Sequence, residues 1–168
     1  MSLQRREPAR LSRRLGSGVA VVVVATAAAA CSHRVEQRTL QDFFDLSRLG
    51  DRAALGAMAT VRFDPSADGV VTAFTIASVD AADPTPFGGD ARTNRIAALS
   101  LADRGGPAAV DGHSGRLASE TVKASATVRL ESGQLLEKTV SVVLARAVMT
   151  GDEITGRWIV TGFTAHAK

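Results

Sequence analysis

Residues 121–130 read Thr-Val-Lys-Ala-Ser-Ala-Thr-Val-Arg-Leu, a regular alternation of polar and apolar side chains. Successive side chains of a β-strand point to opposite faces, so this pattern predicts a strand with one buried face, as in an antiparallel sheet. Residues 131–134, Glu-Ser-Gly-Gln, predict a hairpin turn after it. Residues 138–149 and 156–164 predict two more strands, although Arg146 interrupts the alternation of the first of them. The three strands predict a meander paired antiparallel in sequence order.

Residues 39–58 predict helix before these strands. Their first apolar side chains have the i, i+3, i+4 spacing of a helix face: Leu40, Phe43 and Phe44. Thr39, with an acidic residue three positions later, is expected to cap the N-terminus. Gly50 is expected to end this helix, and Asp51 to cap a second, short one.

The middle of the chain carries weaker signals. Residues 60–63 predict a short strand, and the β-branched run over residues 70–79 predicts a longer one. Residues 80–115 hold many Gly, Pro and Asp residues and are expected to be largely irregular. Within them, residues 95–101 fit either a strand or a short helix; the loop-like flanks favour an edge strand.

The predicted fold class is α+β: residues 39–168 form one domain, with an N-terminal helix, broken near Gly50, packed on a curved antiparallel sheet. The segments Leu49–Leu55 and Gly156–Ile159 resemble the helix break and terminal strand of the nuclear-transport-factor-like, or SnoaL-like, family. The resemblance covers roughly residues 39–164 and implies a cone-like, cystatin-type roll. That family includes isomerases, dehydratases, ligand binders and assembly modules, so the fold does not imply one function.

Residues 1–30 have the parts of a signal peptide. Five arginines precede a stretch, residues 15–32, that has no charged residue and is richest in valine over residues 19–24. Small residues then stand immediately before the only cysteine, Cys31: Ala28, Ala29 and Ala30. The pattern resembles the lipobox of bacterial lipoproteins, although Leu is usual where Ala28 stands.

The lipobox resemblance implies that Cys31 receives a lipid and that cleavage occurs just before it. Residues 31–38 would then be a tether, and the domain would be anchored in the bacterial cell envelope, facing the periplasm or the exterior. Ordinary cleavage and a retained membrane anchor are the alternatives, since an apolar stretch of this length is near the minimum that spans a bilayer. Residues 12–15, Ser-Arg-Arg-Leu, also resemble a twin-arginine export signal, so the export route stays open.

The net positive charge of the chain comes from the predicted signal peptide, residues 1–30. The whole chain has 20 Lys and Arg residues against 17 Asp and Glu residues. Five of the arginines and one glutamate lie before Cys31, which leaves 15 basic and 16 acidic residues from Cys31 onward. A basic surface for nucleic acid is therefore not expected.

The sequence shows little catalytic machinery. The three histidines, His33, His113 and His166, lack the spacing of a metal site, and neither a metal nor a cofactor is expected. Residues 112–115, Gly-His-Ser-Gly, fall one position short of a nucleophile elbow. SnoaL-like enzymes such as ketosteroid isomerase place Tyr and acidic residues in the cone, whereas this chain has no tyrosine. No catalytic residue is assigned.

The sequence favours a lipid-anchored, non-catalytic module that binds an envelope protein or a small apolar ligand. The aromatic side chains best suited to line a pocket in such a cone are Phe43, Phe44, Trp158 and Phe163. The alternative is an envelope enzyme, isomerase-like or dehydratase-like, with Asp42 or Asp45 as its base. A carboxylate that faces an apolar pocket would favour the enzyme, and a solvent-facing one the binding module.

Overall fold

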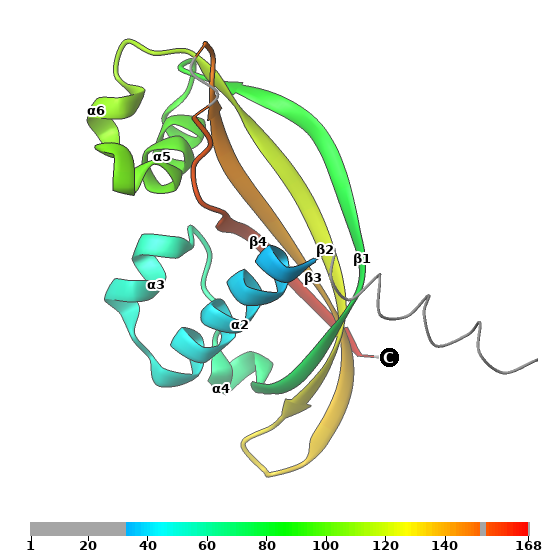
Figure 1. The fold of residues 1–168 in the computed structure, drawn as a ribbon. Helices are drawn as coiled ribbons and strands as arrows, with labels where there is room; N and C mark the ends of the chain where they lie inside the picture. The colour runs from blue at the N-terminus through cyan, green and yellow to red at the C-terminus, as the bar shows by residue number, and fades with distance from the viewer. Residues whose placement is uncertain (1–32, 152–153, 168) are drawn as a thin grey trace, which may run out of the picture. The chain divides into compact units, whose positions relative to one another are not determined.

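The computed structural model describes residues 33–151 and 154–167. The predicted leader, the cleavage site at Ala28–Ala30 and Cys31 lie outside the described residues. The described chain is an α+β domain built on one open, four-stranded sheet (Figure 1). The strands are β1 (Val70–Phe87), β2 (Gly115–Arg129), β3 (Leu135–Met149) and β4 (Ile159–Ala167).

All neighbouring strands pair antiparallel, in the order β1-β2-β3-β4. The predicted meander of β2, β3 and β4 is therefore confirmed. β2 and β3 pair without a break in register, from Gly115 opposite Met149 to Arg129 opposite Leu135. Gly133, with φ of +85°, supplies the left-handed residue of the hairpin turn between them. Three register shifts lie between β1 and β2 and one between β3 and β4; such bulges bend strands, and the sheet is visibly bowed (Figure 1).

Helix α2 (Arg34–Leu49) and helix α3 (Arg52–Met58) lie with the one-turn helix α4 (Pro65–Asp68) on the concave side of the bowed sheet (Figure 1). Gly50, between α2 and α3, is left-handed with φ of +68°, and the Asp51 carboxylate accepts a hydrogen bond from the Ala54 N–H. Four α2 residues are fully or almost fully buried: Leu40, Phe43, Phe44 and Ser47.

The predicted N-cap at Thr39 is wrong, because α2 begins at Arg34, inside the expected tether. Thr39 is an interior helix residue whose Oγ1 donates to the carbonyl of Val35, one turn earlier. Residues 34–38, Arg-Val-Glu-Gln-Arg, are mostly good helix formers, so the helix extends past the expected cap.

Three predictions for the middle of the chain are also wrong. Residues 60–63 are not a strand; the single bridge nearby joins Ala59 to Val160. Residues 95–101 are not an edge strand: most of this segment belongs to helix α5 (Ala91–Ser100), which starts where the Asp90 carboxylate accepts the backbone N–H groups of residues 92 and 93. Residues 80–115 are also not largely irregular, because β1 continues through Pro84 and Pro86 to Phe87 and helices occupy much of the remainder. β1 is an edge strand, where proline is tolerated.

Two short helices, η1 (Ala102–Arg104) and α6 (Pro107–Val110), complete the domain. Side chains of the strands contribute to two hydrophobic cores. The first packs α2 against side chains such as Val122 and Leu144, and the second packs α5 and α6 against Leu117 and Ala145. Because β2 and β3 pair without a register shift, residues an odd number of positions apart point to opposite faces. The same strands therefore bury alternate side chains in different cores.

Candidate functional site

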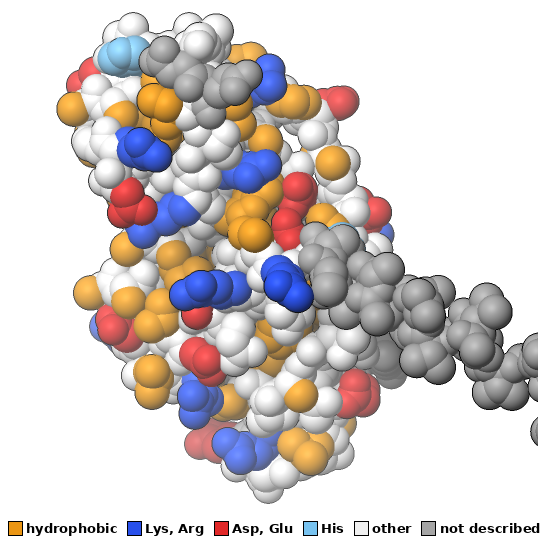
Figure 2. Space-filling model, viewed as in Figure 1, with side chains coloured by type: hydrophobic (Ala, Val, Ile, Leu, Met, Phe, Trp, Pro, Cys, Tyr) orange, Lys and Arg blue, Asp and Glu red, His pale blue; other side chains and the backbone are white. Residues whose placement is uncertain are grey.

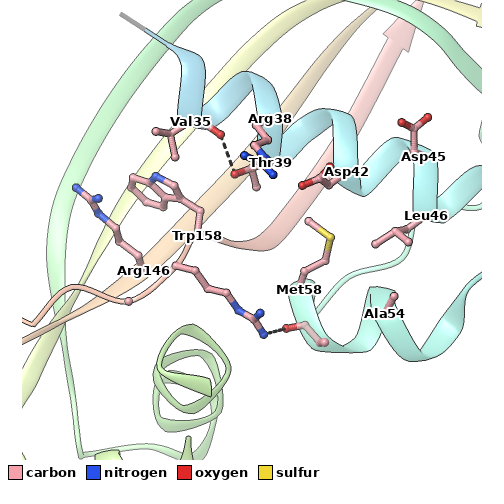
Figure 3. A pocket seen from close by; sticks show the side chains of 13 residues that line it. Val35, Arg38, Thr39, Asp42, Asp45, Leu46, Ala54, Met58, Arg146 and Trp158 are labelled. Carbon is pink, nitrogen blue, oxygen red and sulfur yellow. Dashed lines mark hydrogen bonds between the residues drawn. The ribbon is translucent and has the colours of Figure 1, made fainter. Parts of the chain in front are cut away.

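A cavity of about 660 Å³ lies between α2, α3 and the segment that leads into β4 (Figure 3). Its walls are largely apolar, with charged side chains set among them. The apolar lining residues are Val35, Leu46, Ala54, Ala57, Met58 and Trp158, and the charged ones are Arg38, Asp42, Asp45, Arg146 and Arg157. An apolar hollow with a few polar groups is the usual form of a small-molecule site.

Trp158 and Arg146 form one wall of the cavity. The Arg146 guanidinium lies over the Trp158 ring, 4.4 Å from its centroid, and the tryptophan is only 6% exposed. This distance is within the range of a cation–π interaction. The Nε of Arg146 is buried and has no hydrogen-bond partner among the described residues. The wall therefore combines a flat apolar ring with a donor that a ligand acceptor could satisfy.

Arg157 and Ser100 fix the segment that carries Trp158. Arg157 donates from Nη2 to the Ala57 carbonyl at 3.0 Å, which ties this segment to α3. Ser100, at the end of α5, donates from Oγ to the Arg157 carbonyl at 2.7 Å and accepts from the Ala147 N–H at 2.9 Å. Since Ser100 is almost fully buried, these bonds hold α5, β3 and the cavity wall in one arrangement.

The two acids considered as catalytic bases lie along α2 at the edge of this cavity (Figure 3). Asp45 has a side chain 45% exposed, accepts a hydrogen bond from Gln41 at 2.8 Å and pairs with Arg48 at 3.4 Å. Asp42 is an exposed residue. Both carboxylates line the cavity, but Asp42 is exposed to solvent and Asp45 is half-exposed, and this exposure favours binding over catalysis.

Glu120 of β2 lies close to charged residues at the N-terminal end of α2. Glu120 on β2 is only partly exposed, and the charges of Glu36, Arg146 and His33 all act on it. Burial raises the pKa of Glu120, and the negative charge of Glu36 acts in the same direction. One buried oxygen of Glu36 and one of Glu120 have no hydrogen-bond partner in the described part of the chain. The two carboxyl groups therefore destabilise one another where both are ionised.

Glu120→Gln is expected to stabilise the protein at neutral pH. The folded-state pKa of Glu120 lies above its ordinary value of 4.5. The folded protein consequently binds more protons than the unfolded chain between these two pKa values, and stability falls as the pH rises through that window. The gain in melting temperature should thus be largest at neutral pH and vanish below the ordinary pKa, where both states are protonated. Thermal unfolding over a pH series measures it.

Glu131→Gln, in the exposed β2–β3 hairpin, is the matched control and should leave the pH profile unchanged. If Glu120→Gln instead lowers the melting temperature at neutral pH, attraction by Arg146 outweighs burial and the Glu36 charge.

The structure separates the four aromatic residues expected to line a pocket. Trp158 lines the cavity. Phe43, Phe44 and Phe163 pack against one another in the first core, with ring centroids 5.5 to 6.5 Å apart. Phe44 also borders a separate hollow of about 260 Å³ beside β1. The three phenylalanines are therefore core residues and do not line the cavity.

Sequence reasoning did not assign Arg146 or Glu120 to a site, although both carry a signal. They occupy the same alternation as the buried residues Leu144 and Val122, so each is a charged residue at a position that faces inward. Charged side chains are rarely buried without a partner, so a charged residue at an inward-facing strand position is a candidate site residue.

Within residues 33–151 and 154–167, no group of three or more His, Cys, Asp or Glu side chains is placed to hold a metal ion. In the same ranges, none of the helices combines the length and the apolar character needed to cross a bilayer. In comparisons with known proteins, the chain matches no family model, no curated protein and no solved structure.

Proposed function

We propose that this domain is a non-catalytic binding module that takes a small, largely apolar ligand in the cavity between α2, α3 and Trp158. The observation that carries the proposal is the lining: a volume of about 660 Å³ walled by Trp158, Met58, Val35 and neighbouring apolar side chains. Burying apolar ligand surface there is favourable by about 25 cal/mol per Å². The arginines at the margin would orient a polar end of the ligand.

The same geometry gives little support to the alternative, an isomerase-like or dehydratase-like enzyme. A general base must lie within hydrogen-bond reach of its substrate, and its pKa is usually shifted by burial. The Asp45 carboxylate is half-exposed and already bonded to Gln41 and Arg48, and Asp42 is exposed to solvent. Within the binding proposal, the alternative to a small ligand is a protein partner that binds at the mouth of the cavity.

The domain architecture fits a cone-like roll of the SnoaL-like kind, and we include that assignment in the proposal. It rests on the bowed antiparallel sheet, on the helices of its concave side, and on the chain reversal at Gly50 between α2 and α3 (Figure 1). In such a roll, a ligand lies between the helices and the sheet.

The ligand site is tested by filling it. Ala54→Leu adds bulk at a lining position of α3 and should lower affinity for the apolar probe 1-anilinonaphthalene-8-sulfonate about tenfold, or about 1.4 kcal/mol. Trp158 is the only tryptophan, so energy transfer from it to the probe reports binding at this cavity. Ala53→Leu, on the exposed face of the same helix, is the control. Equal affinity in both variants would contradict the proposal.

We also propose that Cys31 carries the lipid that anchors the module in the cell envelope. A single acyl chain gives only marginal membrane binding, whereas two or more anchor firmly. Cys31→Ser should therefore shift the protein out of the membrane fraction, or leave it unprocessed. Intact-protein mass spectrometry should find a mature wild-type chain that begins at Cys31 with added lipid mass. A mature chain that starts elsewhere, or has no lipid, contradicts the anchor.

A further inference from the structure

We propose that a second hollow, bounded by α3, residues 59–65 and α5, binds the phosphate group of a small phosphate monoester. The hollow has a volume of about 510 Å³ and shares no lining residue with the cavity beside Trp158. Arg52 at the start of α3, Arg62 in the following loop and Arg95 on α5 all line it. Figure 2 shows basic side chains (blue), with apolar ones beside them, in the band between α5 and α3.

The three arginines are available to a ligand. In the described ranges, none of their guanidinium groups lies within 4.0 Å of a carboxylate, whereas Arg48 and Lys123 each form an ion pair. Helix α3, the loop that follows it and the more distant helix α5 bring these like charges to one hollow, and their repulsion is unfavourable unless an anion offsets it. Uncompensated basic groups around a concavity are the usual form of an anion site.

Ser47 supplies the second, independent observation. It is only 3% exposed, lines the same hollow from α2, and its Oγ has no hydrogen-bond partner among the described residues. A serine inside a helix ordinarily bonds to the carbonyl one turn earlier or faces solvent. Leaving a buried hydroxyl unsatisfied is unfavourable, so this hydroxyl is placed to bond a ligand oxygen.

The donors favour phosphate over carboxylate. Each guanidinium offers a planar fork of N–H donors that matches the oxygens of a phosphate, and a phosphate monoester carries up to two charges on three free oxygens. One acid, Asp64, also lines the hollow. Its carboxylate is committed to capping α4, since Oδ1 accepts from the Ser66 Oγ and N–H, and the Ser66 hydroxyl holds the pKa of Asp64 below its ordinary value.

The rest of the lining suits an apolar substituent on the phosphate. Leu55, Val61 and Phe63 lie in the same hollow, whose volume exceeds that of a bare phosphate ion. The matching chemistry is a phosphate ester with an apolar group, which can come from a soluble metabolite or from the head of a phospholipid. The proposal makes no use of the cavity beside Trp158, so either site can fail without the other.

Calorimetric titration of the full chain with phenyl phosphate, inorganic phosphate and short-chain dihexanoyl phosphatidic acid tests this assignment. Phenyl phosphate should bind more tightly than inorganic phosphate. Arg52→Gln, Arg62→Gln and Arg95→Gln should each lower its affinity about tenfold. Arg104→Gln, an exposed arginine of η1 outside this lining, is the charge-matched control and should bind as the wild type does.

Ser47→Ala separates ligand recognition from folding. It should lower phenyl phosphate affinity severalfold while the melting temperature of the free protein stays equal or rises, because an unsatisfied hydroxyl is removed. Dihexanoyl phosphatidic acid binding alone, lost in the same arginine variants, would support the site with a lipid headgroup as its source. The assignment is overturned if no probe binds, if inorganic phosphate matches phenyl phosphate, or if the arginine variants bind like Arg104→Gln.

Discussion

Replacing Phe44 with alanine is expected to lower the free energy of unfolding by about 3–5 kcal/mol. The ring is only 4% exposed and lies at the centre of the aromatic cluster of the first core. It makes tilted or edge contacts, with centroids 5.5 to 6.4 Å apart, to four other rings: Phe43, Phe63, Phe74 and Phe163. Truncation therefore removes the burial of the ring, its aromatic contacts and the packing between α2 and the sheet. Urea denaturation followed by circular dichroism measures the loss.

Leu49→Ala is the matched control, because Leu49 lies on the same helix but is 70% exposed. It should change the free energy of unfolding by no more than about 0.5 kcal/mol. A Phe44→Ala variant within about 1 kcal/mol of the wild type would show that the cluster is not a core and that Phe44 is free to serve as pocket lining.

The meander was predictable because its signal is local. Residues 121–130 alternate, since one face of β2 is buried against α2 and the other is polar, and the Gly-bearing turn fixes the pairing with β3. The end of β1 was not predictable in the same way. Its residues 80–87 contain Asp and Pro, which argue against a strand. Only the position of β1 at the edge of the sheet, a tertiary fact, makes them acceptable there.

Residues 95–101 illustrate an ambiguity that a local signal could have resolved. Short apolar runs fit a strand or a helix equally well. Asp90, with Thr93 three positions later, carries a capping signature, and the structure uses it: the Asp90 carboxylate accepts the N–H of Thr93 at 2.9 Å. The prediction of a strand rests on the flanking Gly and Pro residues and does not use this cap.

The cavity itself could be predicted only in part. Trp158 was a candidate because large aromatic side chains often line pockets, and it does line this one. Its partners come from α2, α3 and β3, which are distant in sequence, so no local pattern assembles them. Arg146 was visible as a break in alternation, but its position over the Trp158 ring depends on how the segment before β4 folds back.

Gly156→Ala should be the second severe variant, with a loss of about 2–4 kcal/mol in the free energy of unfolding. A Cβ at this position would overlap the Oγ of Ser100 and lie 2.6 Å from its carbonyl oxygen. Neither neighbour can withdraw easily: the Ser100 Oγ bonds to both Arg157 and Ala147, and its carbonyl accepts the Arg157 N–H at 2.9 Å. The strain is therefore expected to separate α5 from β3.

Because the displaced segment carries Trp158, Gly156→Ala should also weaken probe binding at the cavity, which ordinary destabilisation elsewhere would not do below the unfolding transition. Gly56→Ala is the matched control. Apart from the adjoining backbone of its own helix, no heavy atom lies within 4 Å of a Cβ there, and alanine within helix α3 should stabilise the protein by about 0.5–1 kcal/mol. Chemical denaturation, with energy transfer from Trp158 to the probe, measures both effects. If Gly156→Ala unfolds at the wild-type denaturant concentration, the contact with Ser100 is not what holds the cavity wall.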